Sequence, residues 1–196
     1  METLLFQILS ALVGALTVYI FGIRKLAIEH RNAFLEKQLS QFYSPIAGYR
    51  KRIRTKSELR VKISNAAEAS WQEICASASK ANQTEIEKEQ FAQYKGIIEY
   101  DNQQLREEFM PLYRKMLDVF TANYWLADED TRAYYQNFVE FVEIWERHLE
   151  AKLPGAVIRK LDHTEENVFP FYEHLDQKLS ELQTELKDKP FWSMRL

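Results

Sequence analysis

The sequence is poor in the residues that form cross-links and turns. It holds one cysteine, five glycines and five prolines among 196 residues. A single thiol, Cys75, excludes an intramolecular disulfide and the zinc or iron–sulfur sites that are built from several cysteines. Because glycine and proline mark turns, their scarcity favours long helices. No run of alternating apolar and polar residues indicates a strand, and we therefore predict an all-α fold.

The signatures of the common enzyme classes are also missing. The chain has no phosphate-binding glycine loop, no GxSxG elbow and no HExxH helix. No histidine has a glutamate three positions before it, which excludes the Glu-x-x-His pairs of di-iron bundles. His148, near Glu146 and Glu150, and His174, beside Glu173, are the remaining candidates for acid–base chemistry, although such histidines are more often solvated. We expect a non-enzymatic protein without a metal or cofactor.

Charge is spread unevenly along the chain. Residues 24–62 carry eleven Lys/Arg and three Asp/Glu, a balance of +8, whereas residues 63–196 carry fifteen and 25, a balance of −10. This asymmetry bears on partners and orientation more than on the fold.

Residues 4–23 form an apolar run of twenty residues without a charged side chain. At about 1.5 Å per residue, a helix of this length matches the roughly 30 Å hydrocarbon core of a bilayer. A signal peptide would need a basic start and a small-residue cleavage site, but only Glu2 precedes the run. We predict that residues 1–23 are a transmembrane anchor; a buried core helix is the other alternative.

The cations that follow the apolar run predict its orientation. Arg24, Lys25, Arg31 and Lys37 all lie on its C-terminal side, and cations near a membrane helix favour the cytoplasmic side. We therefore expect a single-pass protein with its N-terminus outside and its body in the cytoplasm, in a bacterial inner membrane.

Small residues recur four positions apart within the run. This spacing lets two membrane helices approach closely, although it is also common in helices that do not associate. The residues predicted to support self-association in this way are Ser10, Ala11, Gly14 and Ala15.

The rest of the chain shows apolar residues at helical spacings of three and four, interrupted at a few positions. Ser44 and Pro45 predict a kink or a helix restart, and Thr84 has a capping-box pattern at a helix start. Pro111 predicts a kink or break near Met110. We assign residues 24–44 to a basic juxtamembrane helical stalk, 45–188 to a helical bundle of five or six helices, and 189–196 to an aromatic tail.

The densest group of cations lies at residues 50–62. Three roles compete for it: ion pairs with the acidic body, contact with anionic lipid, and contact with nucleic acid. The cations are spread around the helix, whereas a nucleic-acid-binding helix usually presents them on one face. They are Arg50, Lys51, Arg52, Arg54, Lys56, Arg60 and Lys62.

The tail combines Phe191 and Trp192 with cations. It suits a cover for the bundle core, an interfacial anchor or a peptide docked in a groove. From the anchor and the missing catalytic motifs we predict a membrane-tethered interaction module, a scaffold or adaptor that can self-associate with a second copy or bind another protein. The alternative is a membrane-anchored sensor or effector that binds nucleic acid or anionic lipid through residues 50–62.

Overall fold

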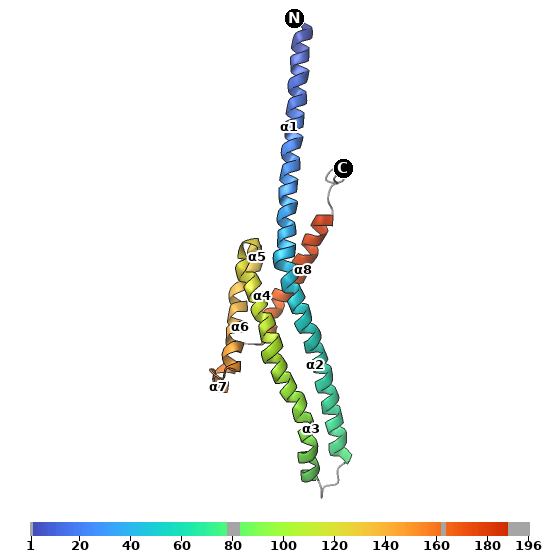
Figure 1. The fold of residues 1–196 in the computed structure, drawn as a ribbon, viewed down its shortest axis with the longest axis vertical. Coiled ribbons are helices and arrows are strands. Elements are labelled where there is room, and N and C mark those ends of the chain that lie inside the picture. The colour runs from blue at the N-terminus through green and yellow to red at the C-terminus, as the bar shows by residue number, and fades with distance from the viewer. Residues whose placement is uncertain (1, 78–82, 162–163, 188–196) are drawn as a thin grey trace.

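The computed structural model describes the chain except residues 1, 78–82, 162–163 and 188–196. The side chains of residues 2–5, 8–9, 11, 77 and 83–93 also lie outside this description, as does the whole predicted tail at 189–196. All regular structure in the described residues is helical, which confirms the all-α prediction. Figure 1 shows a long rod with a helical body packed beside its middle.

The rod is formed by α1 (Glu2–Lys37), the π-helical turn η1 (Gln38–Tyr43) and α2 (Ser44–Ser77), which follow one another without a break. Pro45 cannot donate a backbone hydrogen bond, and its ring would crowd the carbonyl one turn before it. The π turn accommodates the proline because its wider winding pairs the Ser44 N–H with the Leu39 carbonyl, five residues back. At the kink or restart predicted for Ser44 and Pro45, the helix widens into a π turn and continues as α2 from Ser44.

The same solution occurs at the next proline in a helix. α3 (Gln83–Gln104) passes through a second π turn, η2 (Leu105–Phe109), into α4 (Met110–Ala122). The Met110 N–H bonds to the Leu105 carbonyl, and Pro111 follows at the start of α4. At the kink or break predicted near Met110, the chain thus also forms a π turn and continues as a helix.

The remaining elements complete the body beside the rod. They are η3 (Tyr124–Leu126), α5 (Glu129–Arg132), α6 (Tyr135–Leu149), α7 (Gly155–Ile158), η4 (Glu165–Val168) and α8 (Phe169–Lys187). Helix α2 packs mainly on α4, and α8 packs along both α1 and α2. In Figure 1, α8 runs back toward the N-terminal half of the rod.

One hydrophobic core includes residues of η1, α2, α4, α6 and α8, and aromatic rings dominate its centre. Phe120 is fully buried, and its ring centroid lies 5.1 Å from Phe42, 5.1 Å from Tyr135 and 5.7 Å from Phe171. The core begins at Leu35, which is 7% exposed. The C-terminal end of the predicted stalk at 24–44 therefore belongs to the packed body.

Helix α1 projects away from this body (Figure 1). Its contacts with the body include the ion pair of Arg31 with Glu185 and the packing of Phe34 on Trp125, with ring centroids 6.0 Å apart. Among the residues that the structure describes, no helix is both long and apolar enough to cross a membrane. The transmembrane helix predicted at residues 4–23 thus gains no support from them.

Candidate functional site

Several cations of residues 50–62 pair with carboxylates of other helices. Arg52 Nε donates to Glu108 Oε1 at 3.2 Å, and Lys56 pairs with the other oxygen of the same carboxylate. Arg60 pairs with Asp101 at 3.2 Å. Hydrogen bonds from Lys56 and Arg52, in that order, hold the pKa of Glu108 below its usual value. These three cations therefore join α2 to α3 and η2.

Arg50 is the most enclosed of the paired cations and joins α2 to α8. Its side chain is 15% exposed, donates to the Tyr172 carbonyl at 2.9 Å and pairs with Asp176. Its guanidinium carbon also lies 4.6 Å from the centroid of the Tyr172 ring, within the range of a cation–π contact. The planar guanidinium thus holds the two helices together at one point.

The other three cations are differently placed. Arg54 donates to Glu58 on its own helix at 2.9 Å, and Lys51 and Lys62 form no ion pair within the described part of the chain. Four of the seven predicted contact residues are therefore engaged by the acidic body. Contact of this segment with lipid or nucleic acid stays a prediction.

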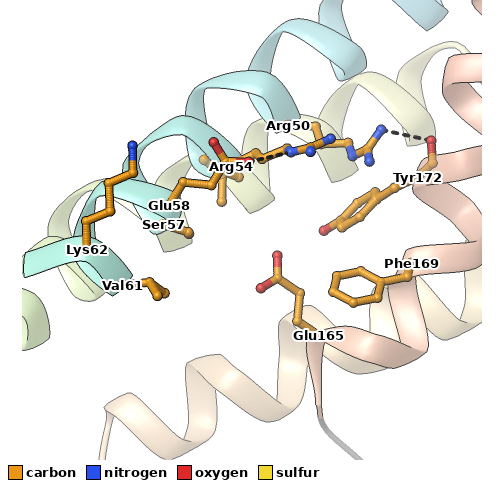
Figure 2. A pocket seen from close by; sticks show the side chains of 10 residues that line it. Arg50, Arg54, Ser57, Glu58, Val61, Lys62, Glu165, Phe169 and Tyr172 are labelled. Atoms are coloured by element: carbon orange, nitrogen blue, oxygen red, sulfur yellow. Dashed lines mark hydrogen bonds and ion pairs between the residues drawn. The ribbon is translucent and has the colours of Figure 1, made fainter. Parts of the chain in front are cut away.

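A groove of about 590 Å³ lies between α2 and the start of α8, shown in Figure 2. Phe169 and Tyr172 form its wall on the α8 side, and the Glu165 carboxylate points into it. The Tyr113 hydroxyl donates to Glu165 at 3.1 Å. The residues from α2 that line the groove are Arg50, Ile53, Arg54, Ser57, Glu58, Val61 and Lys62.

The groove continues past Arg50 along the same two helices. A second hollow of about 580 Å³ shares Arg50, Arg54 and Glu58 with the first and extends to Asp176 and Leu179 of α8. The ion pair between Arg50 and Asp176 separates the two halves. Together they form one elongated depression beside α2, which we call the α2/α8 groove.

The chemistry of the α2/α8 groove suits a peptide better than a phosphate. Glu58 and Glu165 lie among its cations, so that a dianion would meet carboxylates as well as guanidinium groups. Half-exposed Phe169 offers an apolar contact. An extended or helical segment with apolar and charged side chains of both signs fits such a surface.

Neither candidate histidine lies in this groove. The carboxylates near His148 are engaged elsewhere, Glu146 by Arg114 and Glu150 by Lys152. The His148 ring packs edge-on against Trp145, with centroids 5.8 Å apart. No group of three or more His, Cys, Asp or Glu within the described residues could hold a metal ion.

A buried polar cluster around the η1 turn was not predicted from the sequence. Gln38 is 3% exposed and donates to the Leu126 carbonyl at 2.7 Å and to Asp128 Oδ1 at 3.0 Å. Lys178 of α8 pairs with the other oxygen of Asp128 at 3.2 Å. A signal was present, because Gln38 follows Leu35 by three residues within an apolar stripe.

A chain of hydroxyl groups runs beside it from η1 to α8. The Asp128 N–H donates to the Tyr43 hydroxyl (3.3 Å), which lies 2.9 Å from the Thr131 hydroxyl. Thr131 is fully buried and lies 2.8 Å from His174 Nε2. The Tyr43 hydroxyl oxygen accepts a hydrogen bond from the Asp128 N–H, so that the hydroxyl group itself can donate to Thr131 Oγ1. The Thr131 hydroxyl then donates to Nε2 of a neutral His174 imidazole.

This arrangement predicts a pH-dependent stability. Burial, then the positive charge of Lys178, lowers the pKa of His174, against an opposing influence of Asp130, Asp128 and Glu181. The unfolded chain therefore binds a proton at His174 more readily than the native chain. The free energy of unfolding should fall as the pH drops from about 6.5 toward the lower native pKa. Denaturant titrations at pH 7.5 and 5.5 measure this change.

His174→Gln is the matched control for this experiment. The glutamine carbonyl can still accept from Thr131 but does not titrate, so that the variant should lose less stability over this pH range than the wild type. Equal losses in the two proteins would show that other groups cause the pH dependence.

Three of the four predicted small-residue positions on α1 are described, and all three are exposed. A Cβ built on Gly14 would meet nothing within 4 Å, and Ser10 and Ala15 are exposed. The side chain of Ala11 lies outside the described residues. Self-association through this stripe stays a prediction.

Comparison with known proteins adds no relative: no family model matches the chain, and neither does any curated protein or solved structure.

Proposed function

We propose that this protein is a membrane-tethered helical interaction module without catalytic activity. Its N-terminal segment embeds in the lipid bilayer, and the rest of the chain faces the cytoplasm and binds protein. The proposal rests on one observation above all: in the apolar run at residues 4–23, the described apolar side chains are exposed on every side of the helix.

Four consecutive residues make this point. Val18, Tyr19, Ile20 and Phe21 are 74, 66, 43 and 66% exposed, and at about 100° per residue they point in different directions around the helix. Apolar surface costs about 25 cal/mol per Å² when it stays in water. A helix that is apolar all round needs an apolar environment, whereas a helix packed on a protein needs only one apolar face.

The polar groups of this segment also suit lipid. The Ser10 hydroxyl donates to the Gln7 carbonyl at 2.9 Å, and the Thr17 hydroxyl donates to the Val13 carbonyl at 2.7 Å. Both hydroxyls thus find partners within their own helix, as an environment without water requires. The finding that no described helix could cross a membrane covers only part of the run, because side chains at residues 4–5, 8–9 and 11 are not described.

The length of the rod supports a binding role away from the proposed membrane surface. From Arg24 to Arg50 a continuous helix rises about 39 Å, and from Arg24 to Ser77 about 80 Å. The basic segment on α2 is therefore several Debye lengths from the membrane that holds α1, since the Debye length is about 8 Å at physiological ionic strength. At this distance, contact of the basic segment with lipids of the same membrane is disfavoured, and a partner in solution is favoured.

For the binding role we assign the α2/α8 groove to a segment of a partner protein. Its aromatic wall and its charges of both signs are typical of a peptide-binding surface. Nucleic acid is the less favoured partner, because Arg50, Arg52, Lys56 and Arg60 are already paired with carboxylates.

The tether is tested with the full chain in its membrane. After alkaline carbonate extraction we expect the protein in the membrane pellet. Partly exposed Cys75 should react with a membrane-impermeant maleimide in inverted vesicles, and in right-side-out vesicles only after detergent; Cys75→Ser is the labelling control. Release by carbonate would contradict the tether, and labelling of intact right-side-out vesicles would contradict the orientation.

A further inference from the structure

The two-helix hairpin of α2 and α3 extends beyond the rest of the body (Figure 1) and is held together by contacts between its helices. These contacts include the ion pair of Arg60 with Asp101, the hydrogen bond from Tyr94 to Ser70 at 2.9 Å, and the packing of Tyr94 on Trp71. Two helices bury only part of their apolar surface against each other. The hairpin therefore leaves apolar side chains in solvent.

Three of these side chains lie on one side of the hairpin. Arg60 and Asp101 pair across the hairpin, and Leu59 and Tyr100 each come one residue before them. Because the two helices are antiparallel, one step back along each helix turns both side chains to the same side of the hairpin. Ile63 follows Leu59 by one turn and shares its face. The three side chains are 55, 63 and 43% exposed, in the order Leu59, Tyr100, Ile63, and we call them the hairpin face.

We propose that the hairpin face binds the hairpin face of a second copy of this chain, so that two hairpins form a four-helix bundle. This inference rests on the proposed membrane tether for its geometry. Two copies anchored in one membrane with the same orientation can be related by a twofold axis only if that axis runs along the membrane normal, and hence along the rod.

An axis in this direction determines which helices become neighbours. Each α2 then lies between its own α3 and the partner's α3, both antiparallel to it, and the two α2 helices lie diagonally opposite. This is the arrangement of an antiparallel four-helix bundle, in which each helix buries a stripe that faces both neighbours. The second copy covers the hairpin face without any change of the fold.

Charge favours the same partner. Helix α2 holds seven cations and three carboxylates, whereas α3 holds two cations and five carboxylates. The diagonal arrangement keeps the two basic helices apart and places each between acidic ones. On the outer rim of the proposed bundle, Lys62 of α2 has no ion pair among the described residues. The carboxylate next to it on the partner's α3 is Glu99, which within one chain pairs with Lys95 of the same helix.

The oligomeric state of the full chain in detergent micelles tests this inference. Light scattering corrected for detergent should give twice the chain mass for the wild type and a single chain mass for Leu59→Arg/Ile63→Arg. Leu12→Arg/Leu16→Arg, with the same substitutions at the same spacing on α1, should remain a dimer. A monomeric wild type, or a dimer that survives the change at Leu59 and Ile63, would overturn the proposal.

Cross-linking keeps the test decisive if the double variant fails to fold. In a Cys75→Ser background, chains with Leu59→Cys are mixed with chains with Tyr100→Cys and oxidised. The mixed disulfide should dominate over the Leu59→Cys homodimer, because α2 faces the partner's α3. The opposite ratio would show that the two α2 helices are in contact and that the proposed arrangement is wrong. Membrane retention is measured separately, so that loss of the dimer and loss of the tether remain distinguishable.

Discussion

Leu12→Arg/Leu16→Arg is expected to move the full chain from the membrane pellet to the soluble fraction. The two leucines are 62 and 59% exposed, one turn apart in the middle of the apolar run. Arginine at the centre of a membrane helix costs about 2.5 to 3.5 kcal/mol per residue on the insertion scale. Two such residues outweigh most of the apolar gain of a twenty-residue segment. Immunoblotting of the two fractions after carbonate extraction measures the change.

Leu59→Arg/Ile63→Arg controls for the added charge. These residues are also exposed and one turn apart, at 55 and 43%, but they lie on α2, about 55 Å along the rod from Arg24. This variant should remain in the pellet. If both variants stay in the membrane, or both leave it, residues 4–23 are not the tether.

Helical periodicity made much of the fold predictable. Leu35, Phe42, Ile46 and Ile53 follow one another at intervals of seven and four residues, the spacing of one helix face, and all four side chains are buried. Such a stripe emerges because only one face of a packed helix loses contact with water. The stripe on α8, with Tyr172, Leu175 and Leu182 buried, follows the same rule.

Periodicity could not reveal how the chain accommodates proline. Pro45 and Pro111 predicted interruptions, since proline in a regular α-helix removes a hydrogen bond and collides with the preceding turn. Each is instead preceded by a π turn, which changes the winding by one residue and leaves the helix continuous. The choice between a break and a π turn depends on the packing of both flanking segments, and that is a tertiary property.

The groove was also out of reach of sequence reasoning. Residues 50–62 were singled out by their charge, but their partners lie far away in the chain: Arg50 pairs with Asp176, and Arg52 with Glu108. Spacing along one helix shows which side chains share a face, and it carries no information on which helix covers that face. The buried cluster at Gln38 had a local signal, a polar residue in an apolar stripe, whereas its partner Asp128 had none.

Phe120→Ala should cause a large loss of stability in this protein. The ring is fully buried among Phe42, Tyr135 and Phe171, which come from η1, α6 and α8, so that its removal leaves a cavity between elements that cannot easily close. Truncation of a buried phenylalanine costs about 3 to 5 kcal/mol. Denaturant unfolding of the full chain, followed by far-UV circular dichroism, measures the loss.

Phe169→Ala is the matched control, because it removes the same atoms from a side chain that is 47% exposed on the wall of the α2/α8 groove. Its cost should be about 1 kcal/mol or less, since it creates no internal cavity. Equal costs at the two positions would contradict the placement of the core at Phe120. A small loss of stability at Phe169 combined with weaker partner binding would show that the aromatic residues have two separate roles. The rings around Phe120 hold α8 against the rod, and the rings at the start of α8 face the partner.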